Sequence, residues 1–424
     1  MTPAPFDICG PLPTGTTLLE ASAGTGKTWT IGALVARYVA EGEARLEQML
    51  VVTFGRAASQ ELRERVRAQL VEAERALAGD LDGVEQTDLV RHLLDCDDAE
   101  RLRRHRRVVE GLASFDAATI ATTHQFCSMV LGSLGVAGDT DAHARLVEDL
   151  DDLLVEVVDD LYLRAFAYAD AEPDFSRDQA LAIARTAVGD PQARLEPSGE
   201  QPGPVARRVS FARAVRAEMD RRKRRLGILS YDDLLSQLAD ALEADDAPAR
   251  ARMRQRWTVV LVDEFQDTDP VQWQVLDRAF TGHATMVLIG DPKQAIYAFR
   301  GGDVTTYLQA AETATTKQTL AVNWRSDQAL LDSFQTVLRG ATLGDDRIVV
   351  HDVTAHHEGG RLRGAPHPEP FRLRVVRRDQ LRRSGSRPLA VGQVRPHVAR
   401  DLALDVRALL AARPEVDGRP LEPR

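Results

Sequence analysis

The sequence predicts an α/β fold in which helices cover both faces of a parallel β-sheet. Short apolar runs, typical of buried strands, alternate with segments whose apolar residues recur at helical spacing. A long stretch between the third and fourth of these runs has no strand-like segment, which indicates a helical insertion. The chain has 424 residues, a length that suggests two or three domains at roughly 150 residues each.

Five apolar runs are the predicted strands. They are TTLLEA at 16–21, MLVVTF at 49–54, ATIATT at 118–123, WTVVLVDE at 257–264 and ATMVLIGD at 284–291. The first two runs are followed by helical patterns. In the second of these patterns Leu62, Val66 and Leu70 recur at intervals of four residues and share one helix face. Strands that alternate with helices in this way favour a parallel sheet.

The helical insertion is assigned to residues 131–250. Within it, segment 148–161 (EDLDDLLVEVVDDL) places its leucines and valines on one face and its acids on the other. The insertion divides a first lobe into residues 1–130 and 251–312.

Residues 313–424 are interpreted as the start of a second lobe that is incomplete. The strand and helix pattern weakens here. One strand is possible at 371–376, and an amphipathic helix is expected at 399–412.

The composition fits a globular protein without membrane-spanning segments. Hydrophobic residues make up 44% and charged residues 28%, which are ordinary values. No apolar run approaches the roughly 18 residues that a membrane helix needs, and the amino terminus carries no pattern of a secretory signal. Cys9, Cys96 and Cys127 are too scattered to indicate a disulfide framework or a zinc site. We therefore expect a cytoplasmic protein with no membrane partner.

The charge of the chain bears on nucleic-acid binding. A net charge of −10 argues against a uniformly basic surface but leaves room for a local basic channel. Two arginine-rich clusters lie at 101–107 and 221–225. Each is either a solvated helix face or a set of contacts to duplex phosphates.

The strongest local signal is the loop after the first predicted strand. It fits a phosphate-binding loop, except that alanine replaces the first glycine. Its residues are Ala21, Ser22, Ala23, Gly24, Thr25, Gly26, Lys27 and Thr28. Small residues let main-chain N–H groups curl around phosphates at the amino end of the next helix. Lys27 would neutralise the β- and γ-phosphates of ATP, and the Thr28 hydroxyl would coordinate Mg²⁺. The alternative is a glycine-containing turn that only caps a helix.

A pair of acids, Asp263 and Glu264, ends the fourth predicted strand. An apolar strand that delivers two carboxylates at its end fits a metal-assisted ATPase. Asp263 would hold Mg²⁺ through water, and Glu264 would polarise the attacking water. Acids in this position can also do no more than solvate a loop, but together with the phosphate loop they predict ATP hydrolysis.

Several segments together resemble the motifs of UvrD-like superfamily 1 DNA helicases. They are ASAGTGKT, VDEFQDTDPVQW, IGDPKQAIYAFRGGD and NWRSD, in that order. LLEASAGTGKTWTI, VVTFGRAASQELRERVR, TIATTHQFC and RRKRRLGILSYDDLL are similar to the RecB-like branch of that family. The resemblance covers about residues 16–330. It implies a RecA-like P-loop NTPase lobe, followed by the beginning of a second RecA-like lobe.

The resemblance implies roles for five further residues around ATP. Gln266 would link the ATP site to the neighbouring motifs. Gln294 would sense the γ-phosphate, with Arg300 in the same network. Arg325 would reach the γ-phosphate from the second lobe, and Trp324 would stack on adenine. For Arg325 the alternative is a surface ion pair.

The resemblance also implies a track for single-stranded DNA. The matching residues are Thr53, Phe54, His124, Phe126, Tyr297 and Phe299. Gly55 stands where the family has a second threonine, which removes one hydroxyl from the track. Aromatic rings suit a motor that must grip any sequence, because every base has a π-face. Core packing is the alternative for these rings.

We therefore expect the ATP- and Mg²⁺-dependent motor of a RecB-like helicase–nuclease. It would act on single-stranded and duplex DNA ends in double-strand-break repair by recombination, with RecC-like and RecD-like partner subunits. No nuclease-like carboxylate cluster and no later helicase motif follows residue 330, so we expect this chain alone to lack full helicase and nuclease activity. The alternatives are a catalytically silent nucleotide-dependent DNA-binding or scaffold module and an AddA- or UvrD-type helicase subunit.

Overall fold

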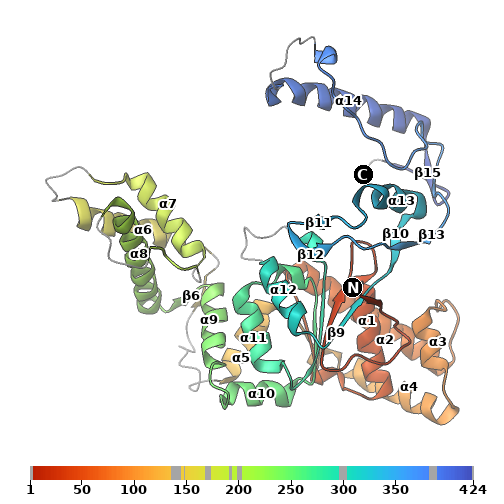
Figure 1. The fold of residues 1–424 in the computed structure, drawn as a ribbon. Helices are drawn as coiled ribbons and strands as arrows, with labels where there is room; N and C mark the ends of the chain where they lie inside the picture. The colour runs from red at the N-terminus through yellow and green to blue at the C-terminus, as the bar shows by residue number, and fades with distance from the viewer. Residues whose placement is uncertain are drawn as a thin grey trace.

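A sheet of seven parallel strands forms the centre of the structure, a computed structural model (Figure 1). The order of strands across the sheet is β1-β9-β2-β8-β7-β3-β4. The structure describes residues 3–134, 145–147, 149–167, 173–190, 193–197, 203–295, 303–381 and 389–422. Because every pair of neighbouring strands is parallel, the carboxyl ends of all the strands lie at one edge.

All five predicted strands belong to this sheet, and the predicted α/β fold is confirmed. They are β2 (Thr16–Glu20), β3 (Met49–Thr53), β4 (Thr119–Thr122), β7 (Val259–Val262) and β8 (Thr285–Gly290). The sheet continues on the other side of β2 with two more strands, β9 (Thr316–Thr319) and then β1 (Ala4–Pro5). β9 lies beyond residue 312, the predicted end of the first lobe. Its polar Thr-Lys-Gln-Thr run has no apolar pattern by which a strand could be predicted.

Alternate residues of the strands face opposite sides of the sheet and form two separate cores. On β3, Met49 and Val51 enter one core, and the residues that alternate with them enter the other. The first core is covered by α1 (Lys27–Glu41), α2 (Arg56–Ala78), α3 (Asp88–Leu94) and α4 (Asp98–Ala113). The second is covered by α5 (Thr123–Leu134), α9 (Tyr231–Ala241), α10 (Pro248–Arg256), α11 (Pro270–Phe280) and α12 (Val304–Thr313). Burial on both faces explains why the central strands are continuously apolar.

Three helices of the insertion form a bundle with its own core and project from the lobe (Figure 1). They are α6 (Asp151–Phe166), α7 (Arg177–Gly189) and α8 (Pro204–Leu226). Short parallel strands β5 (Arg145–Leu146) and β6 (Ile228–Leu229) pair at the base of the bundle. The bundle is smaller than the predicted insertion, 131–250. The last part of that range forms α9 and the first three residues of α10, which pack on the sheet through residues such as Leu235 and Ala249.

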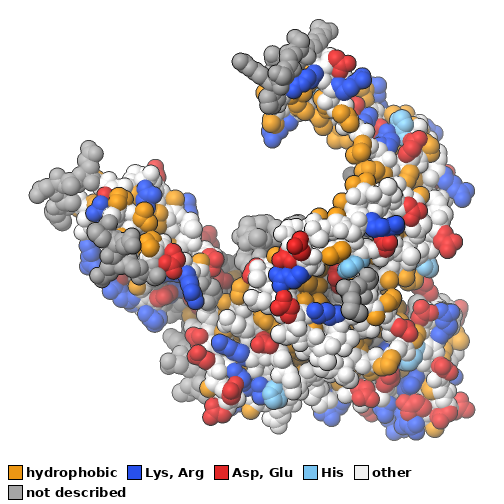
Figure 2. All heavy atoms as spheres, viewed as in Figure 1, with side chains coloured by type: hydrophobic (Ala, Val, Ile, Leu, Met, Phe, Trp, Pro, Cys, Tyr) orange, Lys and Arg blue, Asp and Glu red, His pale blue; other side chains and the backbone are white. Residues whose placement is uncertain are grey.

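The chain after β9 forms a smaller part whose long helix, α14, lies away from the sheet (Figure 1, Figure 2). Its elements are β10 (Val322–Asp327), α13 (Gln328–Leu338), β11 (Thr342–Leu343), β12 (Asp345–Val349), β13 (Thr354–His357), β14 (Leu362–Arg363), α14 (Val391–Ala412), β15 (Glu415–Val416) and β16 (Arg419–Pro420). The helix expected at 399–412 is the C-terminal part of α14, which begins eight residues earlier. The possible strand at 371–376 is wrong, because this segment forms no strand and Leu373 is 79% exposed.

Five short 3-10 helices complete the described elements. They are η1 (Leu46–Gln48), η2 (Phe115–Ala117), η4 (Phe265–Asp267), η5 (Pro292–Gln294) and η7 (Asp379–Leu381). All three cysteines are free, and Cys127 is buried. Within the described ranges, no helix combines the length and the apolar character needed to cross a membrane.

Candidate nucleotide-binding site

The predicted phosphate loop connects the carboxyl end of β2 to the amino end of α1. Gly24 and Gly26 have φ angles of 83° and 87°, in the left-handed region that favours glycine because it has no Cβ. Gly26 is the N-cap of α1. The Ala21 N–H donates to the Gly290 carbonyl at 2.9 Å and anchors the start of the loop to β8. The first N–H groups of α1 have no partner within the helix, so they suit an anion at this edge of the sheet.

Lys27, in the first turn of α1, forms an ion pair with Glu264. Its Nζ lies 2.7 Å from Glu264 Oε2, and the two side chains are 11% and 35% exposed. Glu264 follows β7 in a left-handed conformation, with φ of 49°, which is uncommon for a residue that has a Cβ. Gln266 Nε2 donates to the same Glu264 oxygen at 2.7 Å. The predicted phosphate-binding lysine and the predicted catalytic acid therefore neutralise each other at one point.

Two carboxyl groups beside this ion pair carry strongly raised pKa values. Burial, and then the negative charge of Glu264, raise the pKa of Asp263 to about 7. The same two causes raise the pKa of Asp267 to about 6. One oxygen of Asp267, Oδ1, is buried without a hydrogen-bond partner among the described residues. Buried acids crowded in this way favour a nearby cation, since its charge would lower their pKa values.

The donor set fits Mg²⁺ held jointly by protein and nucleotide. Magnesium takes oxygen ligands, keeps several waters and binds through one or two protein groups plus phosphates. Asp263 and the hydroxyl of Thr28 are groups of this kind. Among the described residues, no cluster of three or more His, Cys, Asp or Glu side chains could hold a metal by itself.

Hydrogen bonds connect the ion pair to the end of β8. Gln266 Oε1 accepts the Asp291 N–H at 2.9 Å, and Gln294 Nε2 donates to Asp291 Oδ2 at 2.6 Å. Gln266 and Gln294, which the resemblance placed near ATP, thus share one partner. Arg300, predicted in the same network, lies outside the described residues.

The segment that begins the C-terminal part lies directly on the phosphate loop. The Trp324 N–H donates to the Gly24 carbonyl at 2.8 Å, and a Cβ added to Gly24 would lie 2.8 Å from Arg325 Cβ. The Trp324 ring is 52% exposed and stacks on the His356 ring at 4.0 Å. Trp324 and Arg325, predicted to bind adenine and the γ-phosphate, are therefore brought to the phosphate loop.

Asn323 is a residue of this contact that sequence reasoning missed. It is 4% exposed, and its Nδ2 donates to the Ala23 carbonyl at 2.9 Å. Its Oδ1 accepts the N–H groups of Arg325 and Ser326 at 2.9 and 2.8 Å. The Asn-Trp-Arg-Ser run is compatible with such an Asx turn, but no sequence signal points to the loop carbonyl.

The predicted DNA-contacting residues separate into three groups. Phe54 follows β3, and His124 lies near the start of α5, directly after β4. Since β3 and β4 are neighbours, with Thr53 opposite Thr122, both side chains lie at the edge that holds the phosphate loop. Burial lowers the pKa of His124, whose ring contacts Tyr231 at 5.0 Å.

Two of these residues are buried, and two lie outside the described residues. Phe126 is fully buried in the sheet core, where its ring meets Trp257 at 5.4 Å. This burial argues against the predicted contact between Phe126 and DNA, because a base could reach the ring only by unpacking the core. Thr53 is 1% exposed, so a direct DNA contact needs a local rearrangement. Tyr297 and Phe299 lie outside the described residues.

Both arginine-rich clusters are largely used inside the protein. In α4, Arg101 and Arg104 donate to the carbonyls of Leu77 and Leu93 at 2.9 Å each. In α8, Arg222 is 8% exposed and pairs with Glu156, Asp160 and Glu218. These contacts favour a structural role over phosphate binding for the arginines that make them.

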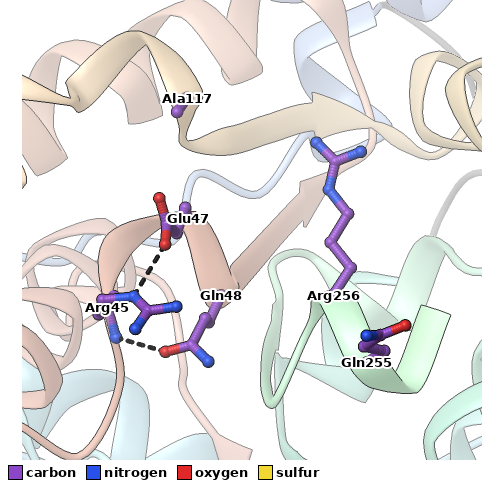
Figure 3. A pocket seen from close by; sticks show the side chains of 6 residues that line it. All are labelled: Arg45, Glu47, Gln48, Ala117, Gln255 and Arg256. Atoms are coloured by element: carbon purple, nitrogen blue, oxygen red, sulfur yellow. Dashed lines mark hydrogen bonds and ion pairs between the residues drawn. The ribbon is translucent and has the colours of Figure 1, made fainter. Parts of the chain in front are cut away.

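A hollow of about 300 Å³ lies at the amino ends of β3, β4 and β7, away from the carboxyl ends that hold the phosphate loop (Figure 3). It is lined by Arg45, Glu47, Gln48, Ala117, Gln255 and Arg256. Both arginines are already engaged. Arg45 pairs with Glu47 at 2.8 Å, and the Arg256 guanidinium lies 4.7 Å from the centre of the Trp257 ring. The hollow is thus separate from the nucleotide site.

The sheet, the two-glycine loop and the acids after β7 define a P-loop nucleotide-binding protein. Sequence comparison then identifies the family. The profile of the UvrD/REP helicase N-terminal domain matches residues 3–315. The chain belongs to this helicase family.

Similar proteins point to one branch of the family. The chain is 60% identical over 408 residues to the RecBCD enzyme subunit RecB of Mycolicibacterium smegmatis, a match covering 96% of the chain and 37% of that protein. It is 28% identical to the RecB subunit of Escherichia coli, over 75% of the chain and 37% of that protein. It is 26% identical to the ATP-dependent DNA helicase UvrD1 of Mycobacterium leprae, over 76% of the chain and 37% of that protein. The chain thus spans less than two-fifths of the length of these relatives.

Proposed function

We propose that this chain is the ATP-dependent motor portion of a RecB-like DNA helicase that acts in double-strand-break repair. The observation that carries the proposal is the network of Lys27, Glu264 and Gln266 beside the two-glycine loop. A lysine that contacts the phosphates and a side chain that orients the attacking water are recurring parts of phosphoryl-transfer sites, and Lys27 and Glu264 lie where they can take these two tasks. The higher identity to RecB subunits than to UvrD1 favours the RecB branch over a UvrD-type helicase.

Each residue of the network has a task in this proposal. Bound ATP with Mg²⁺ would supply the phosphoryl group and the cation that offsets the charge of its oxygens. Lys27 exchanges the Glu264 carboxylate for phosphate oxygens. Glu264, held by Gln266, then accepts a proton from the attacking water. Asp263 and Thr28 hold the cation, and Arg325 approaches from the C-terminal part.

Single-stranded DNA would cross the carboxyl edge of the sheet beside the ATP site. Phe54 and His124 are the described residues that we assign to this track. Stacking on such rings is worth about 1–3 kcal/mol per base and tolerates any sequence. β3 lies next to β7. Phe54, assigned to the DNA track, and the acids Asp263 and Glu264, assigned to the ATP site, therefore follow neighbouring strands.

The partners follow from the names of the relatives. RecB subunits belong to RecBCD enzymes, so we propose RecC-like and RecD-like partners and duplex ends as the site of loading. The helicase and nuclease activities of such an enzyme are proposed for the longer assembly. For this chain the proposal extends to nucleotide binding, hydrolysis and contact with single-stranded DNA.

The test is ATP hydrolysis by the 424-residue chain, with and without single-stranded DNA. We expect turnover that DNA stimulates and that Lys27→Ala abolishes. Nucleotide binding without any turnover would favour the alternative, a nucleotide-dependent DNA-binding module. An absence of nucleotide binding in the folded wild-type chain would refute the proposed function.

A further inference from the structure

Lys293 lies between two carboxylates, close to the nucleotide site. Its Nζ is 2.6 Å from Glu20 Oε1 and 2.8 Å from Asp291 Oδ1. The side chains of Lys293, Glu20 and Asp291 are 13%, 16% and 3% exposed. Burying charges is costly unless they are paired, so the two ion pairs with Lys293 offset part of the cost of burying these side chains.

The two carboxylates belong to the strands on which the site is built. Glu20 is the last residue of β2 and directly precedes the phosphate loop, whereas Asp291 directly follows β8. β2 and β8 are neighbours, with Glu20 opposite Gly290. Lys293 therefore links the end of β2, which leads into the phosphate loop, to the end of β8, which leads to Gln294.

The Asp291 carboxylate is divided between Lys293 and Gln294. Its Oδ1 accepts the Lys293 ammonium at 2.8 Å and the Lys293 N–H at 3.2 Å. Its Oδ2 accepts Gln294 Nε2 at 2.6 Å. A rotation of this carboxylate would move the glutamine amide with it. Without the ammonium, repulsion between the two acids in a poorly solvated site would favour such a rotation.

We propose that Lys293 is a positioning residue for recognition of the terminal phosphate of a nucleoside triphosphate. It holds Asp291 so that Asp291 presents the Gln294 amide at the edge beside the phosphate loop. The inference rests on the proposed function, because it takes Gln294 as the group that senses the terminal phosphate. A lysine that served only to stabilise the fold would affect diphosphate and triphosphate binding alike.

The test compares the binding of two nucleotides, in the presence of Mg²⁺, to the 424-residue chain. A non-hydrolysable ATP analogue and ADP are titrated against wild type, Lys293→Met and Lys293→Arg. We expect Lys293→Met to weaken the triphosphate analogue about tenfold, as for one charge-assisted hydrogen bond, and to leave ADP within about twofold. Lys293→Arg should restore most of the discrimination. Lys317→Met is the matched control, because Lys317 is exposed on strand β9.

A second measurement tests whether Lys293 acts through Gln294. In a Gln294→Ala background, Lys293→Met should cause no further loss of discrimination, since residues acting as one unit are not additive. Equal losses for both nucleotides, no loss in Lys293→Met, or additive losses in the double variant would each overturn the inference. If Lys293→Met does not fold, Lys293→Gln takes its place with the same outcomes. A wild-type chain that binds neither nucleotide would instead refute the proposed function.

Discussion

The Nζ of Lys27 lies 2.7 Å from Oε2 of Glu264, although 237 positions separate these residues in the chain. One residue begins α1 and the other follows β7, and the parallel sheet brings both to its carboxyl edge. In this structure the Lys27 ammonium and the Glu264 carboxylate are paired with each other. In the proposed function, a phosphate bound at Lys27 would replace the Glu264 carboxylate, so this contact would couple nucleotide binding to the release of Glu264.

The ion pair predicts that Glu264→Gln separates nucleotide binding from hydrolysis. The amide keeps the shape of the side chain but cannot accept a proton from water, and it no longer neutralises Lys27. We expect ATP affinity equal to or higher than wild type, and turnover reduced by about 100-fold or more, within the usual range for a lost general base. Fluorescent-nucleotide titration and a phosphate-release assay on the same sample measure both. Turnover within twofold of wild type would remove Glu264 from the catalytic role.

The close approach of the phosphate loop to β10 predicts that Gly24→Ala is destabilising. The left-handed φ of 83° costs about 1–2 kcal/mol for a residue with a Cβ, and this Cβ would lie 2.8 Å from Arg325 Cβ. Gly55→Ala is the matched control, because Gly55 has an extended φ of −128° and no atom within 4 Å of the added Cβ. Urea unfolding should show a loss of at least about 1 kcal/mol for Gly24→Ala and less than about 0.5 for Gly55→Ala. Similar losses in both variants would contradict the contact.

The raised pKa of Asp263 predicts how the stability of the nucleotide-free chain depends on pH. The pKa is about 7 in the folded chain and 3.8 for an unperturbed group. Between these values the unfolded chain loses the proton and the folded chain keeps it, so stability falls as pH rises from about 4 to 7. Asp263→Asn should be more stable than wild type by about 1–2 kcal/mol at pH 8 and nearly equal to it at pH 4. Denaturant unfolding at both pH values checks this, and a difference that is constant with pH would contradict it.

The burial of Phe126 predicts a loss of stability without a specific loss of DNA binding. Phe126→Ala should cost about 3–5 kcal/mol, as for other large-to-small core changes. Phe126→Leu, which keeps most of the volume, should fold and bind a labelled oligothymidylate within about twofold of wild type. His124→Ala, at the sheet edge, should weaken that binding about fivefold or more, the effect of losing one stacking contact. Fluorescence anisotropy measures both affinities, and the opposite order would restore Phe126 to the DNA track.

Much of the first lobe could be predicted because its residues are constrained locally. Central strands that are buried on both faces must be apolar throughout. A loop that wraps around phosphates must consist of small residues, with glycine among them. These requirements act within a few consecutive residues, so the strand at 257–264 and the loop at 21–28 can be predicted from the sequence alone. The same holds for the acids that end a strand, Asp263 and Glu264.

The tertiary structure decided what depends on partners distant in the chain. Phe126 and His124 are two positions apart, yet one packs in the core and the other lies at the sheet edge, because α5 turns one side toward β4 and the sheet. The polar strand β9, the contact of Asn323 with the phosphate loop and the placement of Lys293 between Glu20 and Asp291 have no local signature. A polar residue that bonds to a distant segment is a single polar letter in the sequence. The same letter stands there whether the side chain faces water or a buried partner. The sequence alone thus determined the predicted chemistry of the site, and the packing of the lobe determined which side chains lie where they can take part in it.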